Sequence, residues 1–304
     1  MNDKKILIII NPVAGRGILR QKLWQILSLL NNSGFAPTVL FTKKKGDATE
    51  YAATCPEDYK TVICAGGDGT LNEVISGLMR NKHEHLLGYL PAGTTNDLAT
   101  SLGLSKSMTQ GTKDIIAGYY DTIDIGDFSG RYFNYTASFG AFTEASYNAP
   151  QEVKNILGHL AYIFQGIASL GNIRPYHVKF EFNGMTIEDD FLFGSVSNTI
   201  SLGGILKLKE TLVKLNDGKF EVLLIRDPKN PIGLQQIITD LISQNFSSGL
   251  VNLYHTSEIS VETNEKIDWT LDGEHQCGSQ KNIIKNIPHA VKLILPNPAL
   301  KNQI

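Results

Sequence analysis

The chain has 304 residues, of which 42% are hydrophobic and 19% are charged, a composition typical of globular proteins and a length sufficient for two packed cores. A formal net charge of -2, with no basic run like those that bind nucleic acid, is unlike the electrostatic footprint of a nucleic-acid-binding protein, so we expect no nucleic-acid partner. There is no apolar stretch of about 18 residues to span a membrane and no signal-peptide core, and the three cysteines lack metal or redox spacing, which together favour the cytoplasm.

The first 125 residues alternate between strand-like and helix-like patterns. The continuous apolar run from Lys5 to Ile10 predicts a strand covered on both faces, and the spacing of Leu19, Leu23 and Ile26 predicts a helix after it. This alternation predicts a parallel sheet with right-handed crossovers, in which ligands bind beyond the carboxyl ends of the strands. The predicted strands are 5–10, 38–41, 61–65, 86–90 and 119–125, and the predicted helices are 19–30, 47–53 and 109–117.

The loop after the third strand reads Gly66-Gly67-Asp68-Gly69. Its three glycines allow main-chain N–H groups to converge on an anion near a helix start, and a phosphate is the anion that we expect. Because Asp68 would repel a bare phosphate, it indicates Mg²⁺, or a hydroxyl awaiting deprotonation, between the two. The alternative is a tight strand-to-helix connection in which Asp68 only caps the helix.

Two further polar loops follow strands at the same predicted edge of the sheet. The small-residue loop from Asn11 to Gly17 follows the first strand, and Pro91 to Ala99 combines a glycine, hydroxyls and an acid at a helix start. Taken alone, the second of these is equally a capped helix in which Asn96 or Asp97 is a structural partner. Three such loops after three strands favour one shared site.

Beyond about residue 126 the strand-like segments alternate polar with apolar residues and are often aromatic, which predicts an antiparallel sheet. Asn216-Asp217-Gly218 predicts a hairpin turn that joins strands at 212–215 and 219–225. Helices are predicted at 153–170 and 231–246, and the apolar face of the first suits either a protein core or a lipid surface. We place a domain boundary near residue 125.

Four motifs, in this order and spacing, resemble the soluble bacterial diacylglycerol kinases and related lipid kinases. Gly-Gly-Asp-Gly alone is shared with NAD kinases and phosphofructokinases, but its combination with the other motifs is specific. The match extends along nearly the whole chain. The motifs are Asn11-Pro12-Val13-Ala14-Gly15, Gly66-Gly67-Asp68-Gly69-Thr70-Leu71-Asn72-Glu73-Val74, Pro91-Ala92-Gly93-Thr94-Thr95-Asn96-Asp97-Leu98-Ala99 and Leu271-Asp272-Gly273-Glu274.

The resemblance implies two domains with a catalytic cleft between them. Residues 1–125 are expected to form an α/β nucleotide-binding domain like that of NAD kinases, with a mostly parallel sheet, to which residues 291–304 return. Residues 126–290 are expected to form an antiparallel β-sandwich that binds the lipid substrate. The resemblance also implies ATP as co-substrate and Mg²⁺ as metal.

The family motifs also assign roles to individual residues. Glu274 is expected to be the catalytic base, and Asp68 to act with Asp97 and Asp124 in a network that links nucleotide, magnesium and domain interface. A structural Mg²⁺ is expected at Asp217 with the main-chain carbonyls of Lys214 and Lys219; the alternative is a hairpin turn without a metal. The expected ATP-site residues are Asn11, Pro12, Val13, Ala14, Gly15, Thr42, Gly66, Gly67, Asp68, Gly69, Thr70, Leu71, Asn72, Glu73, Gly93, Thr94, Asp97 and Asp124.

The expected reaction is ATP-dependent phosphorylation of diacylglycerol to phosphatidic acid. Two alternatives stay open: a kinase for another acceptor, such as a phosphatidylglycerol-type lipid, a sphingoid base or NAD, and a non-catalytic nucleotide sensor. A cytoplasmic lipid kinase meets its substrate at the inner face of the cell membrane, so we expect peripheral binding, with Lys43, Lys44 and Lys45 as a candidate contact or simply a solvated turn. The sequence does not decide between a monomer and a homodimer.

Overall fold

The computed structural model describes residues 4–93, 96–140, 174–202 and 206–297. The chain forms two compact units, one made of Met1–Asp124 with His289–Ile304 and the other of Ile125–Pro288. The helix predicted at 153–170 lies outside the described residues. None of the described helices has both the length and the apolar character needed to cross a lipid bilayer.

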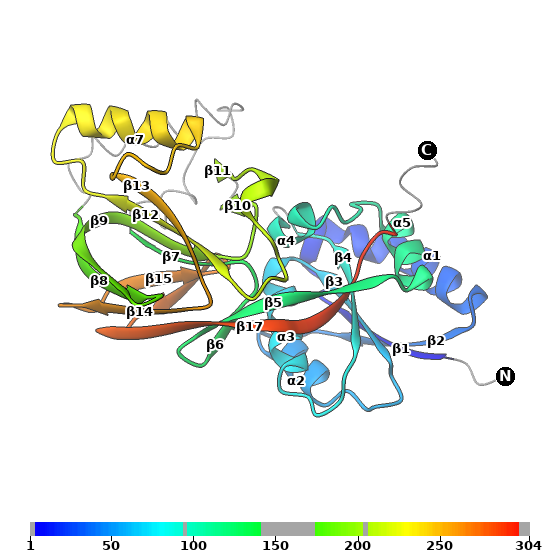
Figure 1. Cartoon of the computed structure of the whole chain (residues 1–304). Coiled ribbons are helices and arrows are strands. Elements are labelled where there is room, and N and C mark those ends of the chain that lie inside the picture. Colours follow the sequence, from blue (N-terminus) through cyan, green and yellow to red (C-terminus); the bar gives the residue numbers. More distant parts are fainter. Residues whose placement is uncertain (1–3, 94–95, 141–173, 203–205, 298–304) are drawn as a thin grey trace. The chain divides into compact units, whose positions relative to one another are not determined.

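The first unit contains a parallel sheet in the order β4-β3-β1-β2, as the alternating pattern predicts (Figure 1). The register places Ile10 opposite Phe41 and Ala65, and Gly66 opposite Pro91, so the carboxyl ends of the four strands lie level. This alignment brings the loops after β1, β3 and β4 to one edge. The strands are β1 (Lys4–Ile10), β2 (Phe35–Phe41), β3 (Thr61–Gly66) and β4 (Leu86–Pro91).

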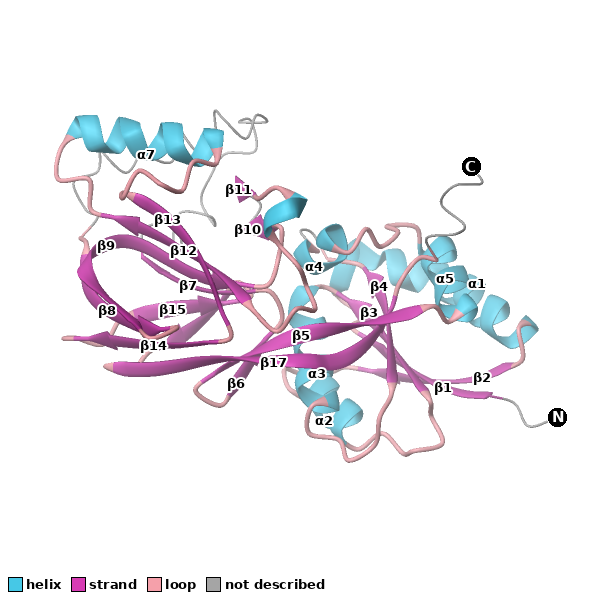
Figure 2. Ribbon diagram, viewed as in Figure 1, coloured by secondary structure: helices cyan, strands magenta, loops and turns pink. Residues whose placement is uncertain are grey.

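Helices cover both faces of this sheet, which explains why β1 is buried from Ile6 to Ile10 and β3 along its whole length (Figure 2). Ile6 and Ile8 of β1 pack in one cluster with Leu19 and Ile115, which come from α1 and α5. Leu7 is also buried, although it alternates to the opposite face. The elements are η1 (Ala14–Gly17), α1 (Ile18–Asn32), α2 (Asp47–Ala53), α3 (Asp68–Leu78), α4 (Asp97–Ser101) and α5 (Met108–Ala117).

Two long strands, β5 (Tyr120–Phe128) and β17 (Lys281–Ile294), contribute residues to both units. At its carboxyl end β17 runs parallel to β4, where Lys292 pairs with Leu86. Elsewhere β17 pairs with β5 and, antiparallel, with β14. The end of the described chain therefore belongs to the sheet of the first unit.

The second unit is antiparallel, as its alternating strands predict, and its core is aromatic. Trp269 is completely enclosed, with its ring centroid 4.9 Å from that of Phe128 and 5.0 Å from that of Phe139. The elements are β6 (Arg131–Phe133), β7 (Thr136–Gly140), β8 (Tyr176–Phe182), β9 (Met185–Ser197), β10 (Ser201–Leu202), β11 (Leu206–Lys207), η3 (Glu210–Leu212), β12 (Phe220–Arg226), α7 (Pro231–Ser243), β13 (Val251–Thr256), β14 (Glu258–Thr263), β15 (Asp268–Leu271) and β16 (Glu274–Cys277).

The hairpin predicted around Asn216-Asp217-Gly218 is wrong. Residues 213–219 form no strand, and β12, which follows them, pairs with β9 on one side and β13 on the other. Because both edges of β12 are occupied, the apolar segment before the turn has no edge to join. Val213 is buried instead in the cluster beneath α7, with Leu212 and Leu215 packed against that cluster.

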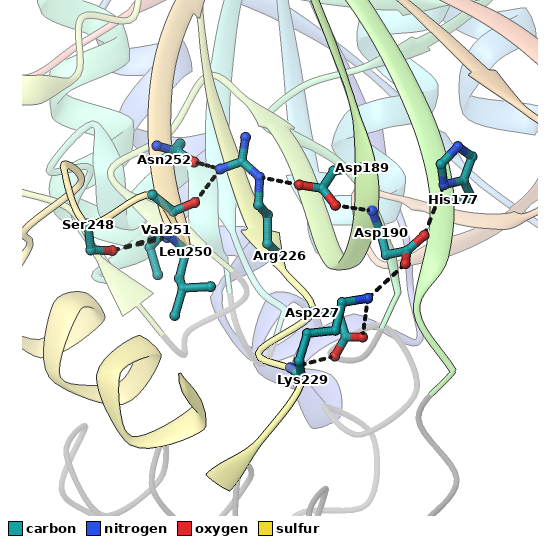
Figure 3. A network of polar contacts seen from close by, with 11 residues as sticks. His177, Asp189, Asp190, Arg226, Asp227, Lys229, Ser248, Leu250, Val251 and Asn252 are labelled. Atoms are coloured by element: carbon teal, nitrogen blue, oxygen red, sulfur yellow. Dashed lines mark hydrogen bonds and ion pairs between the residues drawn. The ribbon is translucent and has the colours of Figure 1, made fainter. Parts of the chain in front are cut away.

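A network of charged side chains fastens β8, β9 and β12 at one end of this sheet (Figure 3). Arg226 Nε donates to Asp189 Oδ2 at 2.9 Å, and Arg226 Nη1 donates to Asn252 Oδ1 and to the Gly249 carbonyl. Lys229 Nζ lies 2.8 Å from Asp190 Oδ2, on the next residue of β9. The partners belong to adjacent strands or to the turns that join them, so we interpret the network as structural.

Candidate functional site

Three loops of the first unit meet at the carboxyl ends of its parallel strands. Asn11 Nδ2, after β1, donates to Thr70 Oγ1 in α3 at 3.0 Å. Gly15 has a φ of +65°, and a Cβ added to it would lie 2.5 Å from the Ala92 carbonyl oxygen, after β4. Glycine is therefore required at position 15 both by backbone conformation and by space.

The second and third loops touch through main-chain atoms. A Cβ on Gly67 would lie 3.2 Å from the Gly93 Cα, and a Cβ on Gly93 would lie 2.8 Å from the Gly67 Cα. A Cβ on Gly66 would also lie 2.7 Å from the Thr70 Cβ. The glycines thus leave bare backbone at the junction, and bare backbone next to the first turn of a helix is a surface that can bind phosphate.

Asn96 holds this junction together, which agrees with the structural role that the sequence offered as one alternative for Asn96 or Asp97. Its Oδ1 accepts from Gly93 N at 2.9 Å and from the Tyr89 hydroxyl at 3.2 Å, and its Nδ2 donates to Gly93 O at 2.7 Å. Its main-chain N–H donates to Asp68 Oδ2 at 2.8 Å. Asn96 has a φ of 52°, a conformation that asparagine tolerates better than most residues, and this preference was the only local signal.

Asp68 does not cap the helix that it begins. The N-cap of α3 is Gly67, without a side-chain capping hydrogen bond, and the Asp68 carboxylate instead accepts from Asn96 in the neighbouring loop. Its Oδ1 is buried and has no hydrogen-bond partner among the described residues. Burial raises the pKa of Asp68, and the Asn96 N–H opposes that rise. A buried carboxylate oxygen of this kind suits a hard cation such as Mg²⁺.

The Glu73 side chain, on α3, is hydrogen-bonded to main-chain N–H groups at the start of α2. Its two carboxylate oxygens accept from Gly46 N at 2.9 Å and from Ala48 N at 3.3 Å. These contacts fix the loop that follows β2, where Thr42 N donates to the Ile10 carbonyl at 2.9 Å. Glu73 therefore supports the loop that carries Thr42, and both of its carboxylate oxygens are engaged there.

The remaining predicted ATP-site residues differ in exposure. Val13 is 85% exposed, whereas Leu71 is completely buried and offers only its main chain. Asp97 is buried at the start of α4. Asp124 is completely buried in β5, where its Oδ1 accepts from His289 N of β17 at 2.8 Å. Thr94 lies outside the described residues.

In the second unit, Glu274 follows a two-residue turn between β15 and β16. Leu271 pairs with Glu274, and the intervening Asp272 and Gly273 have φ values of 49° and 83°, which correspond to a type I′ turn. The Asp272 carboxylate accepts from Asn134 N at 2.6 Å and from Tyr135 N at 3.0 Å, and also from Thr136 N at 3.1 Å. Asp272 therefore anchors the turn.

The Glu274 side chain is 40% exposed, and its Oε2 lies 3.0 Å from Arg131 Nη2. A partly exposed carboxylate on an anchored turn can accept a proton from a substrate without a movement of the main chain. Arg131 was not among the predicted site residues. It stands in an ordinary strand pattern, and only the fold brings it to Glu274.

The turn at Asp217 is compact and exposed. Asp217 Oδ1 accepts from Lys219 N at 3.0 Å, and Gly218 follows with a φ of +74°. Lys214 and Lys219 are exposed as well. This is a local turn in which a carboxylate binds the main chain two residues further on.

Comparison with known proteins places this arrangement in a family. Residues 5–128 match the model of the diacylglycerol kinase catalytic domain. The chain is 31% identical over 295 residues to a diacylglycerol kinase of Bacillus subtilis (strain 168), covering 96% of this chain and 97% of that protein. It is also 31% identical over 303 residues to a diacylglycerol kinase of Staphylococcus saprophyticus subsp. saprophyticus, covering 99% and 98%.

The fold agrees with these similarities. A solved structure from Bacillus anthracis str. Sterne superimposes with a TM-score of 0.77 at 27% identity, covering 97% of this chain and 96% of that one. The resemblance and the fold class predicted from the motifs are both confirmed.

Replacement of Asp68 by asparagine separates the contribution of Asp68 to the stability of the protein from its contribution to turnover. Because burial raises the pKa of Asp68 above its ordinary 3.8, the wild-type protein loses stability as the pH rises from about 3.8 through the folded-state pKa. The D68N variant keeps an acceptor for Asn96 N–H but carries no charge. In magnesium-free buffer at pH 7 we expect its urea midpoint to equal or exceed that of wild type, while turnover falls about 100-fold or more.

The control variant is D58N. Asp58 is an exposed acid whose pKa is lowered by its hydrogen bond from Lys5, so its loss should reduce stability slightly at pH 7 and leave turnover unchanged. Normal turnover of D68N together with a lowered urea midpoint would show that Asp68 serves the fold alone.

Proposed function

We propose that this chain, which belongs to the diacylglycerol kinase family, uses ATP to phosphorylate the hydroxyl of diacylglycerol and so forms phosphatidic acid. Membership of the family makes the chain a lipid kinase; the donor, the metal and the acceptor are our proposal. The observation that carries it is the junction of Gly67, Gly93 and Asp68, where bare backbone lies beside a buried carboxylate oxygen.

Phosphoryl transfer needs positioned phosphates, neutralised charge and a hydroxyl directed in line at the γ-phosphorus. In our proposal the main-chain N–H groups of the loop after β3 and of the first turn of α3 hold the phosphates, and the loops after β1 and β4 pack against that loop. Asp68, through its Oδ1, would hold Mg²⁺, which supplies neutralisation of phosphate charge when it is bound. Asn96 and Glu73 keep the loops in place.

We assign the general base to Glu274. A glutamate carboxylate can accept the proton of an alcohol that attacks phosphorus. Its position directly after a type I′ turn, anchored by three hydrogen bonds to Asp272, supports this role. The sensor alternative gives neither Glu274 nor Asp68 a purpose, and we therefore favour catalysis.

Diacylglycerol resides in membranes, so we propose that the protein works at a bilayer surface and binds it peripherally. Lys43, Lys44 and Lys45 are exposed, and the main-chain N–H groups of Lys43 and Lys44 both donate to Asp47 Oδ2, at 2.7 and 3.0 Å. This contact fixes the turn that presents the three side chains. Anionic lipid would strengthen binding by about 1 kcal/mol for each lysine near the surface.

A panel of acceptors tests the proposed reaction. The purified protein is incubated with labelled ATP, Mg²⁺ and mixed vesicles or micelles that contain diacylglycerol, phosphatidylglycerol or a sphingoid base, and separately with NAD. We expect label in phosphatidic acid and turnover on diacylglycerol at least about tenfold above every other acceptor. Phosphorylation of NAD without any lipid product, or ATP binding without turnover, would replace the proposal with one of the alternatives.

Glu274→Gln tests the assignment of the base. The amide keeps the size of the side chain and an oxygen acceptor for Arg131 but cannot take the proton, so kcat should fall by about 100-fold or more. ATP affinity, measured by equilibrium binding, should stay within twofold. The matched control is E258Q, because Glu258 is an exposed glutamate of the same unit that pairs with Lys285, and its kcat should not change. A kcat for E274Q within a few-fold of wild type would assign the base elsewhere.

We also propose a structural Mg²⁺ at the turn that contains Asp217. Its ligands would be the Asp217 carboxylate and the main-chain carbonyl oxygens of Lys214 and Lys219, a set of hard oxygen donors that suits Mg²⁺. The lysine side chains would take no part. Asp217 Oδ1 also accepts from Lys219 N within the turn.

Asp217→Asn should raise the Mg²⁺ concentration needed for half-maximal activity and lower the Mg²⁺-dependent increase in melting temperature. The control is D127N. Asp127 Oδ1 likewise accepts a main-chain N–H in a turn, from Gly130 at 2.6 Å, and the variant therefore loses the same charge from the same kind of contact. Equal magnesium dependence in both variants and in wild type would exclude the metal.

A further inference from the structure

Arg131, on β6, contacts three acceptors along β16. Its Nη2 donates to Glu274 Oε2 at 3.0 Å, and its Nη1 donates to Gln276 Oε1 at 2.6 Å and to the His275 carbonyl at 3.3 Å. The guanidinium therefore holds two side chains and the main chain between them. An ordinary surface ion pair would make only the contact with Glu274.

The geometry of β16 explains how one guanidinium reaches both side chains. Successive residues of a strand point to opposite faces, so Glu274 and Gln276 share one face while His275 and Cys277 share the other. The exposure of β16 follows this alternation, with positions 274 and 276 partly buried and positions 275 and 277 exposed. Arg131 lies against the first of these faces.

The segment 131–136 fixes Glu274 at two levels. The main-chain N–H groups of residues 134–136 bind the Asp272 carboxylate and thereby anchor the turn. Arg131, at the start of the same segment, holds the side chain that leaves the turn. The hydrogen bonds to Asp272 fix the position of the Glu274 main chain, and Arg131 fixes the direction of the Glu274 carboxylate.

From this arrangement we propose that Arg131 is the positioning residue for the catalytic base, an inference that rests on the role proposed for Glu274. A glutamate side chain has several rotamers, and a base contributes only when its oxygen lies within hydrogen-bond reach of the proton that it takes. The planar, permanently charged guanidinium selects one rotamer of the ionised carboxylate, which a single point charge does less well. Arg131 acts on the rate through Glu274 and contacts neither ATP nor lipid in this role.

A double-mutant cycle on kcat tests the proposal. R131Q, E274Q and R131Q/E274Q are compared with wild type by incorporation of labelled γ-phosphate into diacylglycerol. We expect R131Q to lower kcat by about 10- to 100-fold with KM for lipid and ATP within about twofold, as a misplaced catalytic group does. In the E274Q background the same change should alter kcat by less than about twofold, because the base through which Arg131 acts is absent.

Two further variants separate positioning from folding. R131K keeps the charge but loses the two-pronged contact, and we expect its kcat to lie between those of wild type and R131Q. R226Q is the matched control, since Arg226 also binds an acid of a neighbouring strand and two acceptors nearby, within the same unit but in the network of Figure 3. We expect R226Q to lower the urea midpoint at least as much as R131Q and to leave kcat within twofold.

The outcomes distinguish the two proposals. A collapse of kcat in E274Q, with R131Q unchanged, keeps Glu274 as base and overturns the role of Arg131. An equal fall of kcat on adding R131Q to wild type and to E274Q also overturns it, as does a rise in the KM for lipid without loss of kcat, which would make Arg131 a substrate contact. Normal turnover of E274Q overturns the assignment of the base itself. Should R131Q fail to fold, the cycle with R131K gives the same decision.

Discussion

The hydrogen bond from Asn96 N–H to Asp68 is the contact on which the loop junction of the first unit depends. It joins the loops after β3 and β4, and the Asn96 side chain completes the junction through Gly93 and Tyr89. The same bond leaves the second Asp68 oxygen buried without a partner among the described residues. A carboxylate in that position costs folding free energy, so the arrangement is understandable when a cation or a reacting hydroxyl completes it.

In the second unit a buried carboxylate also accepts main-chain hydrogen bonds, but there it only anchors a turn. Asp272 is also a buried carboxylate that accepts main-chain N–H groups, but there three donors satisfy it. Such an acid fixes its surroundings and has little capacity left for a ligand. Glu274, two residues later, is half exposed and held by a side chain. In each unit a rigid main-chain contact therefore lies beside the group to which we assign chemistry, and this is how precise geometry is maintained on loops.

The parts of this structure that follow from local sequence were predictable. The apolar runs of β1 and β3 and the glycine-rich turn before α3 follow from local sequence. The contact of Asn96 across the loops and the contact of Arg131 with Glu274 were missed because the partners lie 28 and 143 positions away, which no periodicity reveals. The hairpin at Asp217 was predicted wrongly for the same reason, since turn chemistry is local but the free edge of a strand is not.

The environments of the two principal carboxylates assign them opposite tasks. Burial raises the pKa of Asp68, and its charge becomes favourable when a positive partner arrives, which suits the donor side of phosphoryl transfer. Glu274 is held by Arg131 and is partly exposed, so its carboxylate is both oriented and accessible to a hydroxyl, which suits the acceptor side. If Asp68 and Glu274 exchanged environments, the carboxylate at the cation site would already be paired with an arginine. The catalytic base would then be buried, out of reach of a hydroxyl. The division of labour thus follows from burial and pairing, and both acids are needed because one environment cannot supply both conditions.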